Sequence, residues 1–214
     1  MLILLLLSYL ININGLSKNC IVFYTGGSNL MSTLIYSDFL SEFKEIDVYK
    51  IPFQCNDKYN VQSFFQEMST KYSKISLLAH SSGAVRALNN CNDLVDNVIL
   101  LDPVKTPFFK NTLNYDYLKK LIIINADLSY KWSNTPPFVP FIPFFDIKLS
   151  DLSLEKDKIQ LINIENFGHS DLIDKPYRDL MHNIKISKGN PDRNSINKYH
   201  KYLSDLIKNF IITE

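Results

Sequence analysis

The chain lacks an excess of charge of either sign. Its 214 residues include 23 Lys and Arg against 22 Asp and Glu, which gives a formal net charge of +1 at pH 7. No basic field would attract nucleic acid, so we expect a small-molecule substrate and no nucleic-acid partner. The chain is 46% hydrophobic and 21% charged, which is ordinary for a globular protein, and its length suits one domain with a substantial core.

Cysteine is also scarce. The three cysteines Cys20, Cys55 and Cys91 leave at least one thiol unpaired, which argues against a disulfide framework. Cys20 opens one predicted strand and Cys55 follows the end of the next, so about 15–20 Å is expected to separate them, at about 3.3 Å per residue. A bond between them is not expected. No spacing of Cys and His resembles a metal site, and we expect neither a metal nor another cofactor.

No apolar run is long enough to cross a membrane as a helix. The uncharged apolar run Met1–Leu10 is typical of a signal-peptide core, which predicts that residues 1–16 are a signal peptide and that the protein is secreted. No Lys or Arg precedes the run, and the segment Asn12–Gly15 offers one small residue, so no cleavage site is defined. The alternative is an N-terminal strand or apolar helix packed on the sheet.

Short apolar runs alternate with longer amphipathic stretches, a pattern that predicts helices crossing over a parallel sheet. Residues 17–214 are therefore predicted to form one doubly wound α/β domain, with a mostly parallel sheet of about six strands and helices on both faces. Its ligands should gather at the carboxyl ends of the strands. The predicted strands are Cys20–Tyr24, Ile46–Ile51, Ile75–Ala79, Asn97–Leu101, Leu121–Ile124 and Gln160–Ile164. The predicted helices are Leu30–Phe43, Val61–Tyr72, Ser82–Asn89, Tyr115–Lys120 and Ser195–Ile211.

The segment Ala79-His80-Ser81-Ser82-Gly83 follows the third predicted strand and is typical of a nucleophile elbow, a serine on a strained strand-to-helix turn. Small residues flank such a serine because neighbouring elements crowd the turn. Ala79 stands where the motif usually has its first glycine. The alternative interpretation is a serine-rich helix N-cap after a buried strand.

Other polar residues follow the remaining predicted strands. A glycine-rich loop, Thr25–Asn29, follows the first, Asp102 the fourth, Asp127 the fifth, and the segment Phe167–Asp171, which contains His169, the sixth. A nucleophile, two candidate acids and a histidine thus converge on one edge of the sheet in the order Ser, Asp, His.

This set suits acyl transfer, because a serine hydroxyl needs a neutral imidazole to take its proton and a carboxylate to hold the imidazole's tautomer. We assign Ser81 as nucleophile and His169 as base. Either Asp102 or Asp127 could be the acid, and the preference for Asp102 rests partly on the resemblance given below. The amides of Gly27 and Ser82 are the candidate donors to the oxyanion.

The other histidines are expected to have different roles. His80 precedes the nucleophile and should point away from it into a supporting hydrogen bond. His182 and His200 fall in polar segments near the end of the chain, where a solvated helix face is expected.

These motifs resemble those of the α/β-hydrolase superfamily, and more narrowly its lipase and chlorophyllase-like branch. The similarity extends from Cys20 onward. Residues 79–84 resemble the branch's Gly-His-Ser-x-Gly-Ala elbow, Leu101–Val104 resembles its Leu-Asp-Pro segment, and Phe167–Leu172 resembles its aromatic-Gly-His-x-Asp segment. The resemblance implies a Ser81–Asp102–His169 triad. Thr25-Gly26-Gly27 departs from the usual His-Gly-aromatic sequence, which leaves the oxyanion donor open.

The substrate class depends most on the aromatic, proline-rich segment Pro136–Phe145, whose prolines exclude a regular helix or central strand. Such a loop near the site can cover an acyl pocket, insert into a lipid surface or pack on the core. The sequence therefore predicts a lipase or esterase that cleaves small lipophilic esters. The alternatives are an inactive lipid-binding or partner-binding protein of the same fold, and a thioesterase, peptidase or phospholipid acyl hydrolase.

Overall fold

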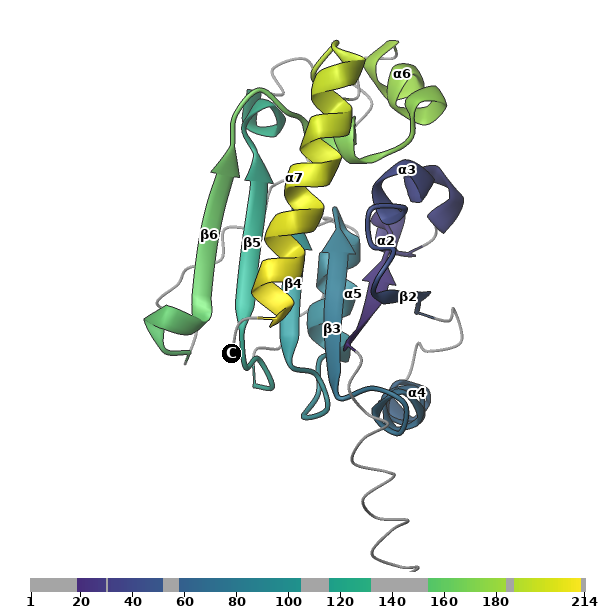
Figure 1. The fold of residues 1–214 in the computed structure, drawn as a ribbon, viewed down its shortest axis with the longest axis vertical. Coiled ribbons are helices and arrows are strands. Elements are labelled where there is room, and N and C mark those ends of the chain that lie inside the picture. The colour runs from purple at the N-terminus through teal and green to yellow at the C-terminus, as the bar shows by residue number, and fades with distance from the viewer. Residues whose placement is uncertain are drawn as a thin grey trace, which may run out of the picture.

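The computed structural model describes residues 19–29, 31–51, 58–104, 116–131, 154–183 and 187–212. Its centre is one six-stranded sheet in the order β2-β1-β3-β4-β5-β6, in which every neighbouring pair is parallel (Figure 1). All six predicted strands are present, as β1 (Asn19–Tyr24), β2 (Asp47–Lys50), β3 (Lys74–His80), β4 (Asn97–Leu101), β5 (Leu121–Ala126) and β6 (Ile159–Ile164).

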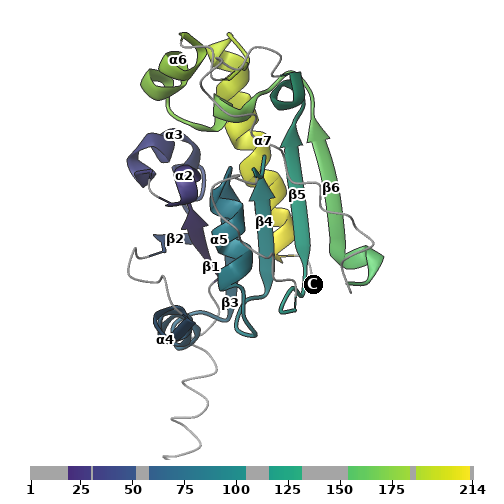
Figure 2. The ribbon, with the colours of Figure 1, turned by 180° about the vertical axis from the view of Figure 1, so that it is seen from behind.

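The helices of the described residues cover both faces of the sheet. In Figure 1, α7 crosses one face, and in Figure 2, α5 lies on the other. The α-helices are α2 (Gly26–Asn29), α3 (Ser37–Leu40), α4 (Lys58–Ser69), α5 (Gly83–Asn90), α6 (Lys175–Asn183) and α7 (Arg193–Ile212). Short 3-10 helices are η1 (Thr33–Tyr36), η2 (Asp127–Lys131), η4 (Lys156–Lys158) and η5 (His169–Leu172).

Alternation along β1 divides the core into two clusters. Val22 and Tyr24 pack in the cluster that contains the buried side of α4 and α5, while Ile21 and Phe23 pack with α3 and α7. A parallel sheet buried on both faces needs apolar residues at successive positions, as β1, β3 and β4 have. These central strands form a rigid base whose carboxyl ends carry the candidate site.

Two helix predictions were wrong. The helix expected over Leu30–Phe43 is divided into η1 and α3, because the Asp174 carboxylate accepts the amides of Ser37 and Asp38 at 3.1 and 3.0 Å and so begins a new helix there. The described part of the expected helix Tyr115–Lys120 forms turns that lead into β5. So short a segment does not repay the cost of helix nucleation.

The sequence analysis also missed α6. Its signal was present, since Asp174 comes directly before the helix and Pro176 lies in its first turn.

Several sequence predictions fall outside the described residues: the signal peptide at residues 1–16, the segment Pro136–Phe145 and Cys55. The other two cysteines, Cys20 and Cys91, are buried free thiols. Among the residues that the structure describes, no helix is long and apolar enough to span a membrane, and no group of three acidic, His or Cys side chains is placed to hold a metal ion.

Candidate active site

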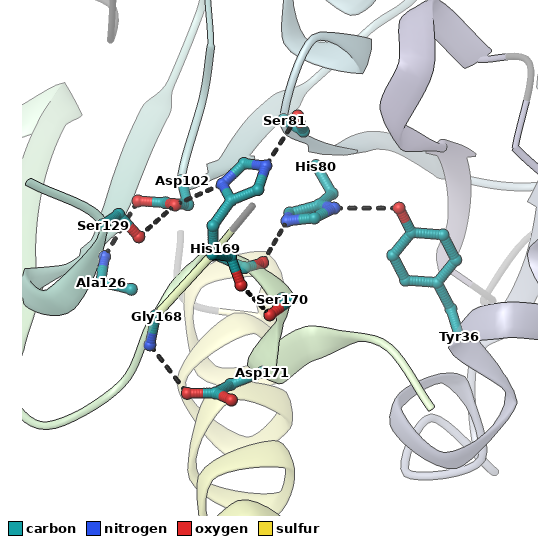
Figure 3. A network of polar contacts seen from close by, with 11 residues as sticks. Tyr36, His80, Ser81, Asp102, Ala126, Ser129, Gly168, His169, Ser170 and Asp171 are labelled. Carbon is teal, nitrogen blue, oxygen red and sulfur yellow. Dashed lines mark hydrogen bonds and ion pairs between the residues drawn. The ribbon is translucent and has the colours of Figure 1, made fainter. Parts of the chain in front are cut away.

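Three side chains predicted to act together lie in one hydrogen-bonded chain at the carboxyl ends of the strands (Figure 3). Ser81 follows β3, Asp102 follows β4, and His169 begins η5 after β6. The His169 Nδ1 atom lies 2.5 Å from Asp102 Oδ2, and its Nε2 atom lies 2.9 Å from Ser81 Oγ. Since the carboxylate can only accept, Nδ1 carries the proton, and Nε2 of the neutral ring accepts the Ser81 hydroxyl.

The backbone of Ser81 has the strain expected of a nucleophile elbow. Its φ is 57°, in the left-handed region, where a non-glycine residue costs on the order of 1–3 kcal/mol. The turn is held by main-chain hydrogen bonds. The Ser81 amide donates to the Leu101 carbonyl at 3.1 Å, and the Ser81 carbonyl accepts the amides of Ala84 and Val104, also at 3.1 Å. The hydroxyl is thereby fixed at the end of β3, facing His169.

Close packing beneath the elbow explains its glycine. A Cβ atom at Gly83 would lie 2.5 Å from the Thr25 carbonyl oxygen and 2.7 Å from that of Tyr24. Both atoms belong to backbone, so no side chain can move aside, and only glycine lets α5 approach the end of β1 this closely. Ala79 is buried within β3 and packs in the core cluster of α4 and α5, which accommodates its methyl group. The departure from the usual motif is therefore structurally tolerated.

The Asp102 carboxylate is buried and held in place by β5 and η2. Oδ1 accepts the Ala126 amide at 3.1 Å, and Oδ2 accepts the Ser129 hydroxyl at 2.7 Å in addition to His169 (Figure 3). The Asp102 amide donates to the Ile124 carbonyl at 2.7 Å, although its own φ is 43°. The alternative acid, Asp127, begins η2. The sequence analysis missed Ser129, whose only signal was its position just after the fifth strand.

The loop that carries His169 is fastened by its own aspartate. Asp171 Oδ2 accepts the amides of Gly168 at 2.8 Å and Asn190 at 2.7 Å. Phe167, which precedes them, stacks on Tyr199 of α7 with ring centroids 4.1 Å apart. These contacts hold the backbone on either side of His169 without involving Ser81 or Asp102.

The remaining histidines are more buried than the sequence suggested. His80 points away from the nucleophile into a supporting hydrogen-bond network, as predicted. His200 is buried, and its Nε2 atom donates to the Asp171 carbonyl at 2.8 Å, so the expected solvated position was wrong. The reason is that α7 packs this face against the loop of η5. His182 is partly buried, and burial lowers the pKa of both imidazoles.

The glycine-rich loop predicted after β1 is instead the short helix α2 (Gly26–Asn29), and it lies close to the nucleophile. A Cβ atom at Gly26 would come within 3.4 Å of Ser81 Cβ. The Gly26 amide donates to the Tyr36 hydroxyl at 3.1 Å, whereas Gly27 is exposed and has a φ of 61°, which glycine adopts without strain. Ser82 is the N-cap residue of α5, directly after the nucleophile.

The buried carboxyl of Asp171 should make stability depend on pH. Burial raises its pKa from 3.8 to about 6, although the amides of Asn190 and Gly168 and the charge of Arg178 act in the opposite direction. Oδ1 has no hydrogen-bond partner within the described residues, and the nearby His182 Nε2 atom, at 3.7 Å, has none either. The charged form of this carboxyl is therefore disfavoured in the folded protein.

Because the folded pKa exceeds the unfolded value, the native state binds more protons between about pH 4 and pH 6, and this carboxyl costs stability as the pH rises through that window. We therefore expect the unfolding free energy of Asp171→Asn, measured relative to that of the unsubstituted protein, to rise by on the order of 2–3 kcal/mol from pH 4 to pH 7. Urea unfolding of both proteins at the two pH values measures this change. A difference in unfolding free energy that stays constant with pH would contradict it.

Comparison with solved structures identifies the fold of the chain. No protein-family model and no curated protein matches the sequence. Among solved structures, the chain is similar to a protein of unknown function from Agrobacterium tumefaciens, described as a candidate alpha/beta hydrolase, with a TM-score of 0.50 and 11% identity over 92% of this chain and 89% of that one. This likeness, with the all-parallel six-stranded sheet, shows that the chain has the α/β-hydrolase fold.

Two further solved structures have lower scores. One is a candidate yden-like hydrolase from Pectobacterium atrosepticum, with a TM-score of 0.41 and 11% identity over 89% of this chain and 92% of that one. The other is the thioesterase domain that cyclises the lipopeptide antibiotic surfactin, with a TM-score of 0.46 and 11% identity over 92% of this chain and 93% of that one.

Proposed function

We propose that the protein is a secreted serine hydrolase that cleaves esters of lipophilic substrates through an acyl intermediate on Ser81. The observation that carries the proposal is the hydrogen-bonded chain from Asp102 through His169 to Ser81, with both ring nitrogens of the histidine engaged. The strained elbow and the fold are further support. In this arrangement the Ser81 hydroxyl donates to His169 Nε2, the nitrogen that can take its proton.

The first half of the reaction forms the acyl enzyme. Ser81 Oγ attacks the carbonyl carbon of the ester while its proton passes to His169 Nε2, and Asp102 stabilises the imidazolium that results. The tetrahedral oxyanion is held by the amides of Ser82 and Gly27, each worth on the order of 3–4 kcal/mol of the barrier. Gly26 cannot share this role, because its amide is taken by Tyr36. His169 then returns the proton to the departing alkoxide.

The second half releases the acid. Water enters in place of the alcohol, His169 takes a proton from it as it attacks the acyl carbonyl, and the Ser81 hydroxyl is regenerated. The substrate needs only an acyl carbonyl with a leaving group that accepts a proton. The preference for lipophilic esters is supported by the aromatic, proline-rich sequence of residues 136–145. The proposal of secretion is supported by the apolar run at residues 1–10.

Two measurements on the unsubstituted protein test this function. A series of p-nitrophenyl esters from acetate to palmitate should be hydrolysed, with faster turnover of the longer acyl chains. A fluorophosphonate should label Ser81 covalently, as read by mass spectrometry of the tryptic peptide. A folded protein that neither hydrolyses any ester of the series nor takes the label would overturn the proposal in favour of an inactive binding protein of the same fold.

A further inference from the structure

His80, the residue before the nucleophile, lies beneath the imidazole of His169. Its side chain is buried, and the two rings are 4.7 Å apart between centroids, inclined by 31°. Both of its ring nitrogens have a partner in Figure 3. Nδ1 lies 2.9 Å from the Tyr36 hydroxyl, and Nε2 lies 3.1 Å from the main-chain carbonyl oxygen of His169. His80 thus bonds to the main chain of the base and packs against its ring, while its own nitrogens stay away from the reacting atoms.

The partners determine the tautomer of His80. A carbonyl oxygen can only accept, so the proton lies on Nε2, and Nδ1 of the neutral ring accepts the Tyr36 hydroxyl. That hydroxyl in turn accepts the Gly26 amide at 3.1 Å. The four groups form one directional chain of hydrogen bonds, from the amide of Gly26 to the carbonyl of His169.

Burial keeps the two titratable side chains of this hydrogen-bonded series, Tyr36 and His80, neutral. It lowers the pKa of His80 well below its usual value, and a proton on the nearby His169 ring would act in the same direction, although the hydrogen bond to the His169 carbonyl acts the other way. Burial also raises the pKa of Tyr36. A neutral imidazole with both nitrogens paired has one favourable orientation. A buried donor or acceptor left unpaired would cost about 1–3 kcal/mol.

The chain joins the two sides of the candidate site. Gly26 begins α2, which also carries the proposed oxyanion donor Gly27, and a Cβ atom at Gly26 would lie 3.4 Å from Ser81 Cβ. His169 carries the base on the opposite side of the nucleophile. These two segments come from β1 and β6, far apart in the sheet order, so contact through the sheet does not align them directly.

We propose that Tyr36 and the neutral His80 are a positioning pair that fixes the backbone of His169 relative to Gly26 and Gly27 at the start of α2, so that base and oxyanion donors keep their spacing around Ser81. The inference rests on the proposed function. It differs from a packing role, in which His80 and Tyr36 would only fill the core: a packing role depends on shape, whereas positioning depends on which nitrogen donates.

Two substitutions of His80 separate its two bonds. The amide of His80→Gln can place a donor near the position of Nε2 and so keep the bond to the His169 carbonyl. The shorter His80→Asn can offer an acceptor near the position of Nδ1 and keep only the bond to Tyr36. For a positioning pair, kcat should fall by about 10-fold in His80→Gln, which breaks the link to Tyr36, and by about 10- to 100-fold in His80→Asn, which releases the backbone of His169 itself. KM should be unchanged in both, because small displacements of a catalytic group cost this much.

Tyr36→Phe keeps the ring and removes the hydroxyl, and it should also lower kcat by about 10-fold. Its matched control is Tyr72→Phe, which removes a hydroxyl that donates to Asp47 at 2.7 Å beside the edge strand β2. The control should retain the kcat of the unsubstituted protein.

NMR spectra of the protein with isotope-labelled histidine measure the tautomer of His80 and the proton on His169 without any substrate. In the unsubstituted protein, His80 should show a protonated Nε2 and a bare Nδ1 that do not titrate between pH 5 and pH 9. The proton on His169 Nδ1, which is hydrogen-bonded to Asp102, should be protected from exchange with solvent. This protection should persist in His80→Gln, whereas in His80→Asn the proton should exchange rapidly. Titration of His80 in this range, a proton on Nδ1, or unchanged kcat and proton protection in both His80→Asn and Tyr36→Phe would overturn the proposal.

The two proposals fail in different ways. If the unsubstituted protein hydrolyses no ester and takes no fluorophosphonate, the proposed function fails, while the spectra still decide whether His80 positions His169. If the unsubstituted protein is active and the spectra or the variants give the contrary results above, only the positioning pair is wrong.

Discussion

Ser81→Ala should abolish ester hydrolysis, lowering kcat by about 10⁴-fold or more, and should eliminate labelling by a fluorophosphonate. In the proposed mechanism the acyl enzyme forms on the Oγ atom, and the rate that remains after loss of such a nucleophile comes from binding and oxyanion stabilisation alone. The hydrogen bonds that hold the turn, to Leu101, Ala84 and Val104, are made by the Ser81 backbone and survive the substitution. Steady-state rates and intact-protein mass spectrometry measure both effects.

A matched serine serves as the control. Ser69 lies at the end of α4, where its hydroxyl donates to the Gln66 carbonyl at 2.8 Å, and Ser69→Ala should retain full activity and labelling. Covalent labelling that persists in Ser81→Ala would place the nucleophile elsewhere.

Asp102→Asn should lower kcat by about 10⁴-fold while leaving the fold intact. In the neutral ring, the Asp102 carboxylate holds the proton on His169 Nδ1 and leaves Nε2 as acceptor for the Ser81 hydroxyl. An amide group at this place can donate to Nδ1, which moves the ring proton to Nε2, where it faces the serine and blocks proton transfer. The amide oxygen can still accept the Ala126 amide, so the geometry is preserved. The pH dependence of kcat/KM in both proteins checks this effect.

Asp127→Asn is the matched comparison, because it makes the same change in the other acid that follows a neighbouring strand. We expect its kcat to stay within about threefold of the unsubstituted protein, since Asp102 supplies the carboxylate at His169 Nδ1. The opposite result, with activity lost in Asp127→Asn and retained in Asp102→Asn, would make Asp127 the acid of the triad in place of Asp102.

The strands were predictable because each buried strand of a parallel sheet is a short apolar run. The runs that became β1, β3, β4 and β5 stand out from a polar background rich in Asn and Lys. Helices were less predictable, because short ones depend on contacts distant in sequence. The amides that begin α3 donate to Asp174, which is 137 residues from Ser37 along the chain. No local pattern near residue 37 contains that information.

The sequence by itself determined the candidates at the site. Parallel strands bring their carboxyl ends to one edge, so residues that directly follow strands, such as Ser81, Asp102 and His169, are expected to meet whatever the details of packing. This geometric rule needs only the strand boundaries and the order of the motifs.

Tertiary structure alone decided which of those candidates contact one another. Asp102 and Asp127 both follow strands, and the sequence favoured Asp102 only through its resemblance to a Leu-Asp-Pro segment, whereas the fold brings Asp102 Oδ2 to 2.5 Å from His169 Nδ1. Ser129, Tyr36 and His80 gained their places in the network because a buried polar group must find a partner, and the partner is whichever group the fold brings within about 3 Å. Sequence spacing specifies where strands end, but hydrogen bonds between segments far apart in the chain exist only once the chain has folded.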